Sequence, residues 1–162
     1  MKAGARPSRT AIRQALTLTL SLLVLTGCRY ETVTHEPVRA ASDTNRFLKA
    51  LYFEEDYPKA LDLADVQLRQ STNADDLKRL VEGIQQQHGK LKTLRADSYL
   101  MTPGSTMELF YIGEYEKGIL YHRLVLMGNA SSGYRVSGVW YQPGAYAAQP
   151  LRRSFNQDIQ VK

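Results

Sequence analysis

Residues 90–141 decide the fold, and they read KLKTLRADSYLMTPGSTMELFYIGEYEKGILYHRLVLMGNASSGYRVSGVWY. Apolar and polar residues alternate here with a period of two, and β-branched and aromatic residues are frequent, which predicts strands. The expected strands cover residues 92–101, 107–115, 119–127 and 134–141. Short turns that contain glycine separate them. Because parallel strands need a long crossover connection, these turns predict an antiparallel meander.

Upstream of the strands, apolar residues recur at helical spacing. A first helix is predicted from the capping residues at 42–44 to about Glu55. Pro58 suits the first turn of a second helix, which the polar residues at 71–73 interrupt. Thr72 or Asn73 then caps a third helix that ends at Gly89. Three helices before four strands predict an α+β fold with the helices packed on one face of the sheet.

The N-terminal segment has the parts of an export signal. Four basic residues, the last of them Arg13, precede an uncharged and largely apolar run over 14–28. This run of about 15 residues is shorter than the ~20 that a helix needs to cross the hydrocarbon core of a bilayer. The alternative to a cleaved signal is an uncleaved signal anchor.

Residues 25–28, LTGC, resemble the lipobox of bacterial lipoproteins. The resemblance implies cleavage before Cys28 and attachment of lipid to its sulfur. Two or three acyl chains anchor a protein stably, whereas a single chain binds only marginally. In Gram-negative lipoproteins an Asp after the cysteine favours retention in the inner membrane, and Arg29 occupies that place here. The resemblance therefore implies the periplasmic leaflet of the outer membrane, within the cell envelope.

Four parts of the chain follow from these patterns. They are a lipoprotein signal peptide over 1–27, a tether over 28–41, an α+β domain over 42–142 and a tail over 143–162. The tether is predicted from its lack of periodicity. In the tail, Leu151, Phe155 and Ile159 recur every four residues. This spacing predicts a short helix or clamp laid back on the sheet.

Most of the net positive charge belongs to the signal peptide. The chain has a formal charge of +5, and four of those charges come from the basic residues up to Arg13. The mature part is therefore nearly neutral, and no nucleic-acid partner is expected. Cys28 is the only cysteine, so its use for lipid leaves none for a disulfide, a metal site or a nucleophile.

Segments along the chain resemble the cystatin-like cone of the nuclear transport factor 2-like superfamily, within which small secreted and lipoprotein domains are the nearest likeness. The segments are FL at 47–48, DYPKA at 56–60, DDLK at 75–78, HGKL at 88–91 and YRVSGVWY at 134–141. The resemblance implies a curved four-stranded sheet wrapped around the helices, often with an internal cavity and with dimerisation through the sheet. It implies no single activity, because this scaffold hosts isomerases, dehydratases and binding modules.

Catalytic groups are sparse. Enzymes of this superfamily use an Asp base, sometimes paired with His, and general acid–base catalysis needs such groups to converge. The strand acids are Asp97, Glu108 and Glu114, and the histidines are His35, His88 and His122. Neither Glu108 nor Glu114 has an obvious partner, which favours solvated side chains. The histidines lack the spacing of a metal site, and no phosphate-binding loop is present. No catalytic residue, metal or cofactor is therefore expected.

Aromatic residues on the strands supply the candidate ligand site. Such residues either pack across strands or line a groove. The candidates are Tyr111, Tyr121, His122 and Trp140. The strand over 119–127 is apolar on both faces and therefore needs cover on both. The helices would cover one face, and a dimer partner or the tail would cover the other.

The sequence therefore favours a membrane-anchored envelope protein that acts as a non-enzymatic binding or assembly module. One alternative is a small isomerase-type or hydrolase-type enzyme of the cone fold, with a site around His122, Glu108 or Asp97. Another is a structural or secretion-accessory lipoprotein without a pocket. The expected partners are the membrane, through lipid on Cys28, and a second copy of the chain or another envelope protein.

Overall fold

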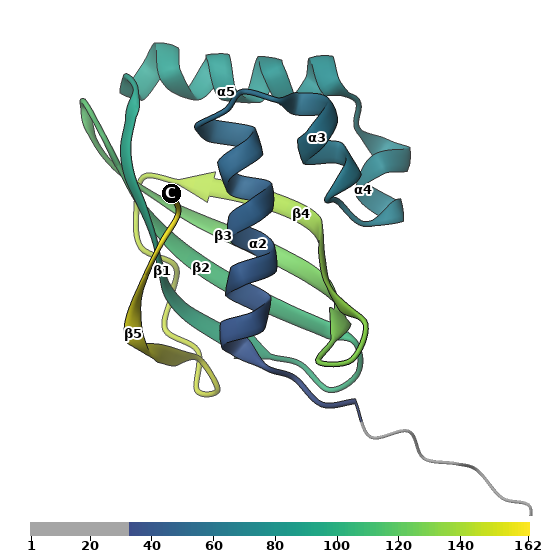
Figure 1. The fold of residues 1–162 in the computed structure, drawn as a ribbon. Helices are drawn as coiled ribbons and strands as arrows, with labels where there is room; N and C mark the ends of the chain where they lie inside the picture. Colours follow the sequence, from purple (N-terminus) through teal and green to yellow (C-terminus); the bar gives the residue numbers. More distant parts are fainter. Residues whose placement is uncertain (1–32) are drawn as a thin grey trace, which may run out of the picture. The chain divides into compact units, whose positions relative to one another are not determined.

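The computed structural model describes residues 33–162, so the signal peptide, Cys28 and Arg29 lie outside the described residues. Helices precede strands in the described part, which confirms the α+β class (Figure 1). The helices are α2 (Pro37–Tyr52), α3 (Tyr57–Asp62), α4 (Val66–Ser71) and α5 (Ala74–His88). None of these helices is long and apolar enough to span a membrane.

Helix α2 begins at Pro37, inside the segment predicted to be a tether. Proline suits the first turn of a helix, because the N–H that it lacks would have no partner there. Ala40 and Ala41 in the next turn are fully buried, so packing holds the early start in place. The predicted cap at 42–44 is wrong: the Thr44 hydroxyl donates to the carbonyl oxygen of Ala40 inside the helix, at 2.8 Å.

The predicted second helix is divided into α3 and α4. The break occurs where the backbone pairs with the edge of the sheet: Ala64 forms a parallel bridge with Val136. The N–H of Asp65 donates to the carbonyl oxygen of Val136 at 2.8 Å. The Asp65 side chain then caps α4. Sequence periodicity could not reveal the break, because its cause is a strand some 70 residues away.

Helix α5 matches its prediction closely. Asn73 and Asp76 form a reciprocal capping box at its start. Gly89 follows its last residue with a φ of 76°, a conformation that favours glycine.

The strands are β1 (Leu91–Met101), β2 (Thr106–Tyr115), β3 (Gly118–Asn129), β4 (Gly133–Gln142) and β5 (Arg153–Gln160). They form one antiparallel sheet in the order β4-β3-β2-β1-β5. The predicted four-stranded meander is therefore confirmed, and a fifth strand extends it. The β3–β4 register shifts at a bulge, because Val125 pairs with Gly138 and Leu126 pairs with Val136. β4 therefore has one extra residue at this point, and the alternation of its side chains between the two faces changes there.

The fifth strand corrects the prediction of a helix or clamp in the tail. β5 pairs with β1, and Ile159 lies opposite Ala96. An unpaired strand edge offers a row of backbone donors and acceptors, which an extended tail can satisfy. Leu151 precedes the strand and stays exposed. The four-residue spacing in the tail was therefore misleading.

Helix α2 lies across one face of the sheet, which we call the inner face (Figure 1). Buried side chains of this face and of α2, α3 and α5 form the hydrophobic core. Leu120, Leu124 and Leu126 point from β3 into this core and are fully buried. On the opposite, outer face, Ile119 is 48% exposed. Phe110 on the outer face is only 2% exposed, because Tyr146 and Arg152 of the segment 143–152 pack on its ring. The tail therefore covers part of the outer face.

Candidate functional site

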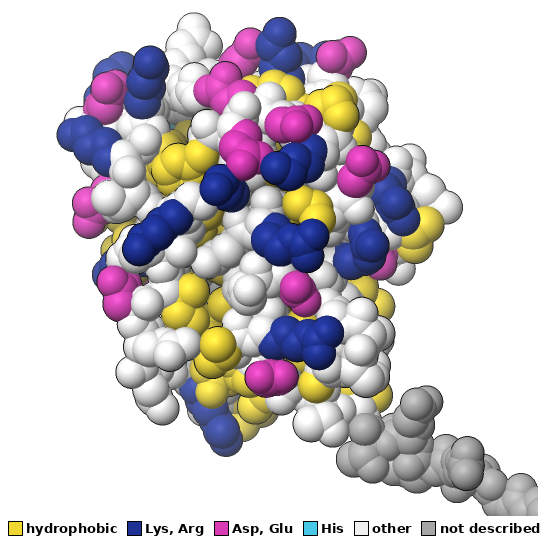
Figure 2. Space-filling view, in the orientation of Figure 1, with side chains coloured by type: hydrophobic (Ala, Val, Ile, Leu, Met, Phe, Trp, Pro, Cys, Tyr) yellow, Lys and Arg dark blue, Asp and Glu magenta, His cyan; other side chains and the backbone are white. Residues whose placement is uncertain are grey.

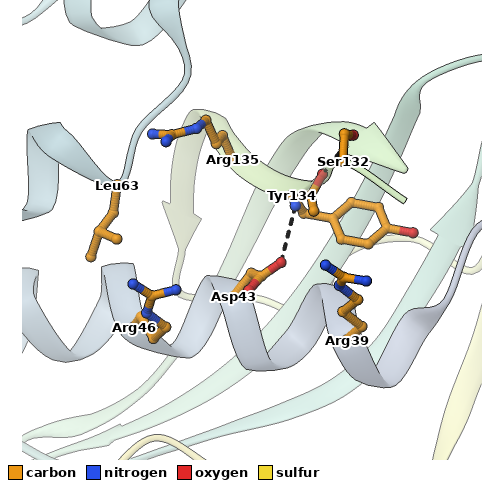
Figure 3. Close-up of a pocket in the computed structure, with 8 residues that line it drawn as sticks. Arg39, Asp43, Arg46, Leu63, Ser132, Tyr134 and Arg135 are labelled. Atoms are coloured by element: carbon orange, nitrogen blue, oxygen red, sulfur yellow. Dashed lines mark hydrogen bonds between the residues drawn. The ribbon is translucent and has the colours of Figure 1, made fainter. Parts of the chain in front are cut away.

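A cavity of about 250 Å³ opens beside α2, the end of α3 and the turn between β3 and β4. We call it the arginine pocket, because three arginines and one aspartate are its charged lining residues. Those side chains are Arg39, Asp43, Arg46 and Arg135, and Ser132 and Tyr134 also line it. Figure 3 shows the α2 side chains directed toward the end of the β3–β4 hairpin.

Helical geometry places three of these charged groups together. Arg39, Asp43 and Arg46 occupy positions i, i+4 and i+7 of α2, so they share one face of the helix. Arg135 reaches the pocket from β4, the edge strand of the sheet. The pocket therefore combines side chains that lie roughly 90 residues apart in the sequence.

Backbone contacts hold two of the arginines. Nη1 of Arg39 donates to the carbonyl oxygen of Ala130 at 2.6 Å. Nη1 of Arg135 donates to the carbonyl oxygen of Asp62 at 2.7 Å. A guanidinium has five N–H donors, so each group is fixed through one nitrogen and can still bind a ligand through the others.

The single carboxylate of the pocket also has a structural role. Oδ2 of Asp43 accepts a hydrogen bond from the backbone N–H of Tyr134 at 3.0 Å (Figure 3). This contact ties α2 to the start of β4. No other acidic side chain lines the arginine pocket.

The pocket is more positive than its surroundings. Residues 33–162 contain 16 basic and 15 acidic side chains, and Figure 2 shows the two kinds interspersed over the face that α2 occupies. Among the ion pairs formed within this part of the chain, none includes Arg39, Arg46 or Arg135. Three guanidinium groups beside one carboxylate leave an excess of positive charge, which favours an anionic ligand.

The predicted ligand residues do not form one site, because they lie on both faces of the sheet. Tyr111 and His122 are on the inner face and are buried. The Tyr111 hydroxyl donates to Oδ1 of Asn45 on α2 at 2.8 Å. Tyr111 therefore joins α2 to the sheet, and its burial raises the pKa of the phenol well above the usual range.

His122 is fully buried between two tyrosines. Its Nε2 lies 3.2 Å from the Tyr115 hydroxyl, and its Nδ1 lies 3.5 Å from the Tyr52 hydroxyl. Burial lowers the pKa of His122 to about 4, so the imidazole is neutral at pH 7. A neutral imidazole has one donor and one acceptor nitrogen, and two phenols can satisfy both. This arrangement stabilises a polar group in the core.

Tyr121 and Trp140 lie on the outer face, near the cation Arg123. Arg123 and Trp140 are directly opposite in the β3–β4 register, and the guanidinium carbon lies 5.3 Å from the centre of the indole ring. Trp140 is 48% exposed. Tyr121 is only partly buried. These two aromatic residues could contact a ligand on the outer face, separately from the arginine pocket.

Two of the three strand acids have arginine partners. Glu108 forms two hydrogen bonds with Arg123, at 2.7 and 2.8 Å, although the sequence offered no obvious partner. Asp97 accepts from Nη2 of Arg152 at 3.0 Å. Glu114 is exposed. The acids and His122 therefore do not converge on one reacting centre.

Two further cavities lie along the tail. One of about 360 Å³ is largely apolar and includes Leu100, Pro103 and Leu151. The other, of about 290 Å³, contains the paired Asp97 and Arg152. Neither combines several cations without acidic partners, so the arginine pocket is the stronger candidate site. Within residues 33–162, no group of three or more His, Cys, Asp or Glu side chains is arranged to hold a metal ion.

Sequence reasoning missed the arginine pocket because it placed Arg39 in the tether. Once the helix is known to begin at Pro37, the spacing of Arg39, Asp43 and Arg46 indicates that they share one face of it. Arg135 could not be added to this group without knowing where β4 packs.

Comparison of the chain with protein families, curated proteins and solved structures finds no significant match.

Proposed function

We propose that this protein is a lipid-anchored component of the cell envelope whose folded domain is a non-enzymatic binding module for an anionic ligand. The observation that carries the proposal is the arginine pocket, where three guanidinium groups surround a single carboxylate. The export signal and the LTGC segment at 25–28 support the anchor. Arg29 after Cys28 favours the periplasmic leaflet of the outer membrane.

A binding role agrees better with the side chains of the domain than an enzymatic one. Catalytic acids and bases need to converge on the substrate with suitable pKa values. Here Glu108 and Asp97 each pair with an arginine. His122 is enclosed by Tyr52 and Tyr115. An isomerase-type or hydrolase-type activity would require at least one of these groups to leave its partner.

The cystatin-like cone remains our proposal for the fold family. Its support is the order of the elements, in which helices precede an antiparallel meander and α2 packs on one face of the sheet. The partly exposed outer face, with Tyr121 and Trp140, is the part of this fold that we propose for contact with a second copy or another envelope protein.

The anchor is tested by Cys28→Ala. We expect this variant to lose metabolic labelling with radioactive palmitate and to be released from membranes after cell fractionation. Cys28→Ala that stays in the membrane fraction as completely as the wild type would indicate an uncleaved signal anchor instead.

The pocket is tested by calorimetric titration of the purified lipidated protein, in neutral detergent, with inorganic phosphate. Arg46→Gln is the sharpest variant, because none of the hydrogen bonds within residues 33–162 uses the Arg46 side chain. We expect roughly tenfold weaker binding, as a charge-assisted hydrogen bond contributes about 1.5 kcal/mol. Arg69→Gln removes an equal charge from the exposed side of α4 and should bind like the wild type. Equal affinity in all three proteins, or no binding to any, would refute the pocket.

A further inference from the structure

The arginine pocket lies beside residues 34–36, at the start of the described part of the chain. The carbonyl oxygen of Thr34 accepts a hydrogen bond from the N–H of Ala130, at 2.8 Å. The N–H of Glu36 donates to the hydroxyl of Tyr134, also at 2.8 Å. Ala130 in turn binds Arg39 through its carbonyl oxygen. The residues that fix the incoming chain are therefore in direct contact with those that form the pocket.

Chain length limits how far Thr34 can be from the lipid anchor. Thr34 follows Cys28 by six residues. Six residues span at most about 22 Å when fully extended. With Cys28 acylated, as in the proposed function on which this step rests, Thr34 cannot move further than that from the bilayer surface. The phosphate groups of the surrounding lipids are then the most concentrated anions within reach of the pocket.

We infer that the arginine pocket binds the phosphate of an anionic phospholipid headgroup in the same membrane that holds the lipid anchor. Guanidinium groups match phosphate well, because their N–H donors form paired hydrogen bonds with two oxygens of one anion. Arg39 and Arg135 are held in place by backbone carbonyls, so little side-chain freedom is lost when they bind.

The size of the pocket agrees with a headgroup. Its volume of about 250 Å³ is below the ~300–1,000 Å³ typical of sites that enclose a drug-sized molecule. A phosphate with a short polar substituent fits such a space, and the acyl chains would stay in the bilayer. Its lining is mostly polar, with Leu63 as one apolar side chain, so an extended apolar ligand is a poor match.

This binding would orient the domain on the membrane surface. The lipid anchor alone attaches the domain to the membrane at a single point of the chain. A second contact with the same surface limits the orientations open to the domain, and it forms readily because linked contacts act at a high effective concentration. The arginine pocket would then fix the orientation of the outer face of the sheet relative to the membrane.

The test uses the lipidated protein reconstituted in vesicles of phosphatidylcholine, with and without phosphatidylglycerol. Hydrogen exchange measured by mass spectrometry reports on the amides of residues 130–135, next to the pocket. We expect phosphatidylglycerol to slow this exchange several-fold in the wild type and in Arg69→Gln, but not in Arg46→Gln. Arg69→Gln controls for the loss of one positive charge from the surface.

The outcomes separate this inference from the proposed function. If soluble phosphate binds in an Arg46-dependent way but phosphatidylglycerol leaves the exchange unchanged, the headgroup assignment is overturned and the anion-binding module stands. If phosphatidylglycerol slows exchange equally in Arg46→Gln, a general attraction to the surface explains it, and the assignment to the pocket is overturned. If neither phosphate nor phosphatidylglycerol has any effect, both proposals fail.

Discussion

The hydroxyl of Tyr115 on β2 lies 3.2 Å from Nε2 of His122 on the neighbouring strand β3, inside the core on the inner face of the sheet. The space around this pair is tight, because a methyl group added at Gly113 would lie 3.1 Å from Nε2 of His122. If His122 were protonated in the folded protein, its charged imidazole would be held in this space without water to solvate it. The energetic consequence is a link between the stability of the fold and pH.

We predict that the free energy of unfolding falls between pH 6.5 and pH 4. The pKa of His122 is about 4 in the folded protein and near 6.5 in the unfolded chain, so in this range the unfolded state binds the proton more tightly. Full stability is therefore present above pH 6.5, and His122 alone removes about 2 kcal/mol of it at pH 5. Urea unfolding of the lipidated protein in neutral detergent at pH 7 and pH 5 measures the loss.

His122→Gln should be less stable at pH 7 and should lose about 2 kcal/mol less than the wild type between pH 7 and pH 5. An identical loss in His122→Gln and wild type would show that His122 is not the group that titrates.

A second prediction concerns Arg152, which fastens the segment 143–152 to the outer face. Its Nε donates to the hydroxyl of Ser98 at 2.6 Å, and its guanidinium carbon lies 3.9 Å from the centre of the Phe110 ring. Ser98 and Phe110 are both buried, so Arg152→Gln leaves a polar and an apolar group without this cover. We expect a loss of about 2 kcal/mol and faster proteolysis within 143–152.

The neighbouring Arg153 provides the control for Arg152. It is exposed on β5, and Arg153→Gln should change the free energy of unfolding by less than about 0.5 kcal/mol. If the two variants unfold at the same urea concentration and are cleaved at the same rate, the contacts of Arg152 do not hold the tail.

Local sequence patterns predict some elements of this fold, whereas others depend on contacts between distant parts of the chain. The β2 and β3 strands were predictable because local alternation and short turns already determine them. The tail was not, since β5 forms only because β1 offers a free edge. The start of α2 depends on the burial of Ala40 and Ala41 under the sheet. The arginine pocket depends on that same start, and on a β4 residue whose position only tertiary structure gives.

A third prediction separates packing from ligand binding at Trp140. Its indole covers Gly138 and stacks near Arg123, which Glu108 holds from the other side. We expect Trp140→Ala to lower the free energy of unfolding by about 1 kcal/mol, through the lost cation–π contact and burial. Because Trp140 is outside the arginine pocket, its loss should leave the affinity for phosphate unchanged.

Trp140 is the only tryptophan of the chain, so its fluorescence gives an independent readout on the outer face. Phosphate should not shift the emission, whereas binding of a protein partner to Tyr121 and Trp140 should. Phosphate affinity that falls in Trp140→Ala, without a matching loss of stability, would place the anion site on the outer face instead.

The last prediction concerns the carboxylate at the centre of the arginine pocket. Asp43 repels an anion, yet it also accepts the N–H of Tyr134 and so holds β4 against α2. Asn keeps an oxygen that can accept this hydrogen bond and removes the charge. We therefore expect Asp43→Asn to fold normally and to bind inorganic phosphate about three- to tenfold more tightly, as expected for loss of one nearby negative charge.

Asp158→Asn is the matched control, because Asp158 is exposed on β5 and carries the same charge away from the pocket. Calorimetric titration of the two variants and the wild type measures the difference. If Asp43→Asn instead binds phosphate as weakly as Arg46→Gln, repulsion by the carboxylate does not limit the affinity, and the contact of Asp43 with the N–H of Tyr134 matters more to the pocket than its charge.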